Sequence, residues 1–222
     1  MQIPARFNGP PGSGNGGWSA GAFAVGSGFT VGGRPLEVTL RKPPPLDTPL
    51  TVADGSVLDP DGVLIAQVAA AGQVGEPVAP ASYDEAAAVS KAYPGFASHP
   101  FPTCYVCGPE RTDGLRLFPG FLSDERSAAP WTVPGDVSVE TVWAALDCPG
   151  GWSALHTGRT FVLGRIAARI SALPEPGSDC VVVGRADTVE GRKAFTSSTV
   201  YSPDGDPLAT ARATWIQVGP VG

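Results

Sequence analysis

A five-residue phrase, Gly-Gly-Trp-Ser-Ala, occurs twice in this chain, at residues 16–20 and again at residues 150–154. Two further matches follow each copy in the same order: residues 40–52 align with 170–182, and the Pro-Asp-Gly turn at 60–62 aligns with that at 203–205. Ordered self-similarity of this kind indicates a duplicated structural unit. Because there are only two copies, we expect two similar domains that close on each other rather than a solenoid.

The composition of the 222 residues is typical of a globular protein, with 42% hydrophobic and 16% charged residues. The 29 glycines and 24 prolines predict many turns and short strands. The net charge of −6 argues against nucleic acid and anionic membranes as partners, because both repel an acidic surface. An anionic substrate such as a CoA thioester would therefore need a local basic patch.

The sequence predicts a cytoplasmic protein without a membrane span. Residues 1–6 lack the pattern of a signal peptide, and no apolar run approaches the ~20 residues of a membrane-spanning helix. In that setting the four cysteines are expected to be reduced thiols, metal ligands or core residues rather than a disulfide framework.

The spacing of apolar residues predicts one helix in each repeat, opening at the Gly-Gly step and followed by strands. In the first repeat, Trp18, Ala22, Val25 and Phe29 fall on one helical face. Glycines within this segment lower its helix propensity, so the helix should depend on packing against a sheet. Strands are predicted at residues 36–40, 50–57, 63–70, 160–170, 180–188, 193–201 and 208–218.

A connector separates the two repeats. We assign residues 1–72 to the first repeat, 73–135 to the connector and 136–222 to the second repeat. Ser82 and Glu85 form the Ser-x-x-Glu pattern of a capping box, which predicts a short helix to about residue 93. A proline-rich irregular segment follows, and the chain is expected to rejoin the sheet at residues 114–118.

A helix packed on an antiparallel sheet, present twice, resembles the double hotdog fold of acyl-CoA thioesterases and thioesterase-like proteins. The segments that carry the resemblance are Asn15-Gly16-Gly17, Ala145-Leu146-Asp147 ahead of Gly150-Gly151, and residues 191–211. The resemblance covers most of the chain outside the connector. It implies an α+β fold in which two antiparallel sheets, each wrapped on a central helix, form an internal pseudo-dimer.

Thioester hydrolysis needs a polarised carbonyl group and an activated water. A helix N-terminus offers free N–H groups and a partial positive charge to a developing oxyanion, and glycine there lets an acyl group approach closely. Gly16, Gly17, Gly150 and Gly151 are therefore candidate substrate-binding residues, with Asn15 as a carbonyl ligand or helix cap. The alternative is that both glycine pairs only permit close packing of helix on sheet.

The resemblance implies that Asp147 acts as the base or orients the water, whereas the alternative role is a helix cap. Its implied partners are a polar residue early in the next strand and one on the penultimate strand, which correspond to Thr160 and Thr199. A longer Gln is common at the second place, so the shorter Thr199 is a departure from the full water-holding triad of the family. The first repeat has Ser13 at the place equivalent to Asp147, so we expect at most one working site.

Two other motifs suggest rival chemistries. Gly17-Trp18-Ser19-Ala20-Gly21 matches the Gly-x-Ser-x-Gly of α/β-hydrolases, with His156 as a conceivable base, but no buried strand precedes it. Cys104-Tyr105-Val106-Cys107 is a single Cys-x-x-Cys. Together with His99 and Cys148 it supplies four candidate zinc ligands, and a redox pair or buried thiols are the alternatives.

From the sequence we predict hydrolysis of an acyl-CoA or related acyl thioester by water activated at Asp147, and we assign no cofactor and no metal. Arg192 and Lys193, in a turn before a strand, are candidate contacts to CoA phosphates, or a solvated turn. A non-catalytic acyl or small-ligand binding protein of the same fold is the main alternative. A dehydratase is a further one, although His156 falls inside the predicted second helix. Exposed edge strands leave assembly into a homo-oligomer open.

Overall fold

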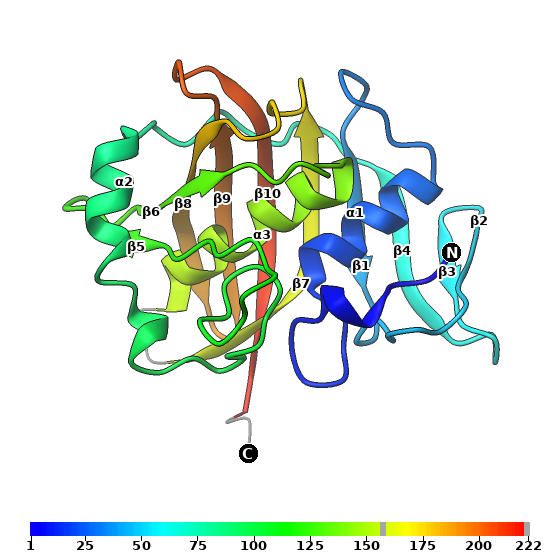
Figure 1. The fold of residues 1–222 in the computed structure, drawn as a ribbon. Coiled ribbons are helices and arrows are strands. Elements are labelled where there is room, and N and C mark those ends of the chain that lie inside the picture. Colours follow the sequence, from blue (N-terminus) through cyan, green and yellow to red (C-terminus); the bar gives the residue numbers. More distant parts are fainter. Residues whose placement is uncertain (156–158, 220–222) are drawn as a thin grey trace.

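A single antiparallel sheet of ten strands is the framework of the protein, and two helices lie across one face of it (Figure 1). The computed structural model describes residues 1–155 and 159–219. The strand order is β2-β3-β4-β1-β7-β10-β9-β8-β6-β5. The strands are β1 (Leu36–Leu40), β2 (Thr51–Ala53), β3 (Ser56–Leu58), β4 (Leu64–Ala70), β5 (Gly120–Phe121), β6 (Ser127–Thr132), β7 (Thr160–Ile170), β8 (Asp179–Glu190), β9 (Lys193–Tyr201) and β10 (Pro207–Val218).

The helices differ in which part of the sheet they cover. Helices α1 (Gly16–Gly26) and α3 (Val139–Leu155) pack against each other and on the sheet, whereas α2 (Tyr83–Ser90) packs on β6 at the far end. Two short 3-10 turns, Ala5–Phe7 and Pro94–Phe96, lie in the loops. Within the described residues no helix combines the length and apolar character needed to cross a lipid bilayer.

Helix α1 begins where the sequence predicts, at the first Gly-Gly step. The side chain of Asn15 caps it, because Oδ1 accepts the N–H of Trp18 at 2.8 Å. A Cβ atom on Gly17 would lie 2.7 Å from the carbonyl oxygen of Trp143, and one on Gly21 would lie 2.8 Å from Cα of Glu140. The glycines therefore let the backbones of α1 and α3 come together, and this packing offsets their low helix propensity.

The strand order repeats on either side of the central β1–β7 pair. Outward from that pair the order is β1-β4-β3-β2 on one side and β7-β10-β9-β8 on the other. The two Pro-Asp-Gly turns occupy corresponding places, before β4 and before β10. Gly62 and Gly205 both have positive φ, 78° and 86°, and each donates its N–H to the carbonyl three residues earlier at 3.0 Å. The two Pro-Asp-Gly turns of the sequence repeat therefore have equivalent positions and the same hydrogen bond in the structure.

The second Gly-Gly step does not open a helix, which corrects the prediction for Gly150 and Gly151. Helix α3 begins at Val139, after Ser138, whose Oγ accepts the N–H of Thr141 at 3.3 Å. Gly150 and Gly151 thus lie in its second half. A Cβ atom on Gly151 would lie 2.5 Å from the ring of Trp215. These two glycines permit close packing on the sheet, and they present no helix N-terminus to a substrate.

The side chains on the two faces of the sheet pack in two different hydrophobic cores. Val182 and Val200 pack in the large core beneath α1 and α3. Their neighbours Val181, Val183 and Tyr201 form a smaller cluster with Ala86 of α2 and other residues of the connector. Because successive side chains of a strand point to opposite faces, a shift of one residue moves a side chain from one core to the other.

Two predicted strands differ from those observed. The predicted strand at 50–57 is the hairpin β2–β3, turned at Asp54-Gly55, where both residues have positive φ. Residues 114–118 do not rejoin the sheet. Instead the N–H groups of Leu115 and Leu117 donate to the carbonyls of Tyr105 and Val106 in the Cys-x-x-Cys segment. The connector pairs with the sheet through β6, which lies beside β8.

The predicted capping box of α2 is confirmed, and it gives a stability prediction. The N–H of Glu85 donates to Ser82 Oγ at 3.2 Å, and the N–H of Ser82 donates to the Glu85 carboxylate at 2.8 Å. We expect Ser82→Ala to lower the free energy of unfolding by about 0.5–2 kcal/mol, since it leaves a helix N–H without its cap. Chemical denaturation measures this, with Ser82→Thr as the control that keeps the hydroxyl; equal loss in both variants would contradict it.

Candidate active site

A cavity of about 430 Å³ opens beside the N-terminus of α1. Its walls come from α1, α3, the ends of β7 and β10, the segment at 40–44 and the connector at 99–107. Much of the lining is apolar, including Leu40, Phe101, Phe161, Leu163 and Trp215. Asp147 and the start of α1 also line it, so the cavity combines an apolar lining with a polar group.

Asp147 lies on α3 but faces the N-terminus of α1. Its Oδ2 accepts the N–H of Gly17 at 2.9 Å and Nδ2 of Asn15 at 3.0 Å. The carboxylate is thus held by the helix of the other half of the chain, where the partial positive charge of the helix end favours a negative group. The sequence identified Asp147, but it placed the carboxylate at the start of its own helix.

The second oxygen of Asp147 is buried and has no hydrogen-bond partner within the described residues. The side chain is only 3% exposed. Burial raises the pKa of the Asp147 carboxyl to about 7, while the hydrogen bond from Gly17 opposes that shift. A buried, unpaired carboxylate oxygen is costly unless a further hydrogen bond is made, so Oδ1 marks a place for a donor such as a water or substrate group.

The first-turn amides of α1 are unequally available. The N–H of Gly17 donates to Asp147 and that of Trp18 donates to Asn15, so neither is free for a substrate. Gly16 lines the cavity, and its N–H donates to no protein acceptor in the described part of the chain. Of the four glycines proposed as substrate-binding residues, Gly16 alone lies in the first turn of α1 with an N–H that no described protein group accepts. Asn15 both caps the helix and holds Asp147.

The structure does not bring Thr199 to Asp147. Thr199 Oγ1 accepts the N–H of Val78 at 2.9 Å, and its cross-strand partner Val183 belongs to the cluster beneath α2. Thr199 therefore lies on the face of the sheet away from α3, and its proposed catalytic role is corrected. The residue of β9 that faces α3 is Ser198, whose Oγ donates to the carbonyl of Leu146 at 2.6 Å. The residue of β9 predicted to face Asp147 was therefore wrong by one position.

Thr160 begins β7, opposite Val218, and it is not part of the cavity wall. Its neighbour Phe161 is buried and does line the cavity. Neither threonine of the predicted triad is thus shown beside Asp147. Among the described residues, only Asn15 and the Gly17 amide hold the carboxylate.

The positive charge at the cavity comes from residues that the sequence analysis did not single out. Arg41 and Lys42 line the cavity, and both are exposed. The sequence feature that could have identified them is the pair of basic residues directly before Pro43-Pro44-Pro45. Arg192 lies in the exposed β8–β9 turn, where its guanidinium donates to the carbonyl of Gln217 at 3.1 Å, and Lys193 is the exposed first residue of β9. They do not line the cavity.

The rival motifs are placed differently. Ser19 lies inside α1, fully buried, and Oγ has no partner within the described residues. It does not follow a buried strand as a nucleophile elbow requires.

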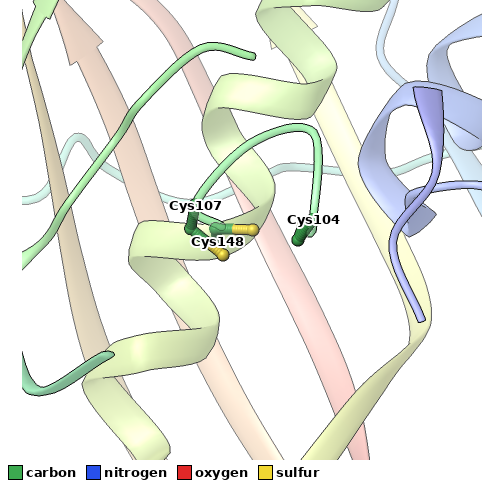
Figure 2. Close-up of side chains that lie close together, drawn as sticks. All are labelled: Cys104, Cys107 and Cys148. Atoms are coloured by element: carbon green, nitrogen blue, oxygen red, sulfur yellow. The ribbon is translucent and has the colours of Figure 1, made fainter. Parts of the chain in front are cut away.

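His156 lies outside the described residues. Cys104, Cys107 and Cys148 come together at the cavity wall (Figure 2), and His99 lies next to Cys107.

Comparison with known structures identifies the fold. A proposed thioesterase from Novosphingobium aromaticivorans is similar over 99% of this chain and 94% of its own, with a TM-score of 0.63 and 15% identity. A hotdog-fold protein of unknown function from Alicyclobacillus acidocaldarius matches 99% of this chain and 92% of its own (TM-score 0.59, 14% identity). The tesB protein of Mycobacterium avium subsp. paratuberculosis matches 99% and 91% (TM-score 0.59, 13% identity).

The chain therefore has a hotdog-type fold over 99% of its length. No protein-family model matches the sequence, and no curated protein matches it. The resemblance inferred from the sequence is confirmed at the level of the fold.

Proposed function

We propose that this protein hydrolyses an acyl-CoA or related acyl thioester, with Asp147 as the base or as the group that orients the water. We further propose that its two halves form a double hotdog, an internal pseudo-dimer divided at the β1–β7 pair. The repeated strand order on either side of that pair supports the division. The thioesterases that share the fold support the reaction class by analogy alone.

One observation carries the catalytic proposal: a buried carboxylate from one half is fixed at the helix N-terminus of the other half, in the wall of an apolar cavity. Gly17 and Asn15 hold Oδ2, which leaves Oδ1 to accept a proton or a hydrogen bond from water. The amide of Gly16 and the positive end of α1 would stabilise the negative charge that develops on the thioester oxygen. The acyl chain would lie along Phe161, Leu163 and Trp215.

Thioester hydrolysis is tested with acetyl-CoA, hexanoyl-CoA and palmitoyl-CoA as substrates for the purified protein. The release of free CoA is followed together with equilibrium binding of the same thioesters. Turnover of at least one chain length above the uncatalysed rate supports the proposal. Tight binding with no turnover of any of the three would contradict it.

A non-catalytic binding protein of the same fold is the second candidate. The position of Thr199 favours it, because that residue lies across the sheet from Asp147 and cannot complete a water-holding triad. A binding protein would keep the cavity and its preference for particular acyl groups. In the experiment above it would show saturable binding alone.

Lys42 gives a prediction for recognition of the CoA group. Its side chain is exposed at the cavity mouth, where it would meet phosphates of a bound CoA. We expect Lys42→Ala to raise KM for acyl-CoA up to several-fold with little change in kcat, since an exposed charge pair is worth about 0.2–1 kcal/mol. KM for the matching acyl-N-acetylcysteamine, which lacks phosphates, should not change.

Lys91→Ala, which removes an exposed lysine after α2, is the matched control. A rise in KM that is equal for both thioesters would show that Lys42 shapes the cavity rather than binding phosphate.

A further inference from the structure

Three cysteines from two distant parts of the chain meet at the wall of the cavity. Cys104 and Cys107 lie in the connector loop and Cys148 lies on α3, and their Sγ atoms are all within 4.8 Å of one another (Figure 2). The three side chains are 4%, 3% and 7% exposed. None forms a disulfide. Three is also an odd number, so a disulfide within this cluster would leave one thiol over.

Two of these sulfur atoms each have a polar side chain beside them. Nδ2 of Asn15 donates to Cys104 Sγ at 3.8 Å. Nε2 of His99 lies 3.4 Å from Cys107 Sγ. The thiolate is the form of cysteine that binds metals, and a coordinated cation itself deprotonates the thiol. Three adjacent buried thiolates repel one another unless a cation lies between them.

We propose that Cys104, Cys107 and Cys148 bind a zinc ion as three thiolate ligands. Tetrahedral zinc with Zn–S bonds of about 2.3 Å places its sulfur ligands roughly 3.8 Å apart. The sulfur atoms are already within 4.8 Å of one another, so only small side-chain rotations are needed. Thiolate ligands and buried surroundings favour zinc over hard cations such as magnesium or calcium. This inference does not depend on the proposed thioesterase activity.

His99 lies outside this ligand set, which differs from the four-ligand alternative raised by the sequence. Its Nδ1 accepts the N–H of Phe101 at 2.8 Å, so the ring proton is on Nε2. Nε2 is 3.4 Å from Cys107 Sγ and donates toward that sulfur. His99 therefore supports Cys107 from outside the coordination sphere. The fourth zinc position is left to a water molecule or a group in the cavity, which all three cysteines line.

The proposed zinc would fix the connector to the helix that carries Asp147. Residues 99–118 contain no helix or strand, and backbone hydrogen bonds such as that from Leu117 to Val106 hold the loop mainly to itself. Cys148 follows Asp147 directly in α3. A metal bonded to Cys148 and to the loop would hold one wall of the cavity in place beside the carboxylate. We expect chelation to lower the melting temperature.

The test is metal analysis of untagged protein produced with zinc in the medium and purified without chelators. We expect one zinc ion per chain by mass spectrometry, released by a mercurial reagent that blocks thiols. Replacement by cobalt(II) should give an intense sulfur-to-cobalt charge-transfer band in the near ultraviolet. Wild-type protein that contains no zinc and takes up neither added zinc nor added cobalt would overturn the proposal, as would a Cys104–Cys107 disulfide found in freshly purified protein.

Variants identify the ligands. Cys107→Ser and Cys148→Ser should lose the zinc, whereas Cys180→Ser should keep it, because Cys180 is an equally buried cysteine in β8 outside the cluster. His99→Ala should also keep the zinc, with weaker retention against a chelator. Loss of zinc from the Cys180 variant alone would refute the assignment. Complete loss from the His99 variant would overturn the three-thiolate form.

Discussion

Asp147→Asn is expected to lower kcat for thioester hydrolysis by about 10²–10⁴-fold, the usual contribution of a positioned acid or base. Asparagine has the same shape, and its carbonyl oxygen can still accept the hydrogen bonds from Gly17 and Asn15. It cannot accept a proton from water at neutral pH. The loss should therefore fall on kcat, while KM and the fold are retained. Steady-state kinetics on the best acyl-CoA of the panel measure this.

Asp204→Asn is the matched control, since Asp204 is exposed in the turn before β10 and away from the cavity. Near-ultraviolet circular dichroism of both variants reports whether the core is intact. A fall in kcat below threefold in a folded Asp147→Asn protein would show that another group activates the water, or that hydrolysis does not proceed through this site.

Gly17→Ala is expected to destabilise the protein by about 1–3 kcal/mol, the usual cost of overpacking a core. The added Cβ atom would lie 2.5 Å from Cβ of Asp147 and 2.7 Å from the carbonyl oxygen of Trp143. Backbone atoms of α3 cannot yield as a flexible side chain can, so the two helices must separate. Because the N–H of Gly17 holds Asp147, activity should fall together with stability. Denaturant unfolding and kcat are the two measurements.

Gly26→Ala on the same helix provides the comparison. Its Cβ atom would meet a Val52 methyl group at 3.3 Å, and no backbone atom of α3 is among its nearest neighbours. This variant should change stability far less, because the gain in helix propensity offsets the small contact. Equal destabilisation of the two variants would show that close approach of α1 to α3 is not what Gly17 provides.

Local signals in the sequence were sufficient for much of the secondary structure. The cap at Asn15, the capping box at Ser82 and the apolar runs of β1, β7 and β9 all depend on residues near one another in the chain. Positions of turns followed from Pro-Asp-Gly for the same reason. The match of the phrase at 150–154 to that at 16–20 was misleading. The same residues begin helix α1 at 16–20, whereas at 150–154 they lie inside α3 and allow it to pack closely on the sheet.

The site itself was predicted only in part. The resemblance to thioesterases pointed to Asp147, but its hydrogen-bond partners Asn15 and Gly17 come from the other half of the chain. Lys42 reaches the cavity only because the segment after β1 lies across its mouth. Such contacts join residues far apart in sequence, and no local pattern records them.

The sequence by itself determined the helix caps and most strands, because each depends on neighbouring residues and on backbone preferences, whereas the resemblance to thioesterases suggested the candidate carboxylate. The tertiary structure decided which face each residue serves and which distant groups meet. Thr199 and Ser198 differ by one position, yet the pleat sends them to opposite cores. Cys148 joins Cys104 and Cys107 only because α3 packs beside the connector loop. Packing of the whole chain sets these distances.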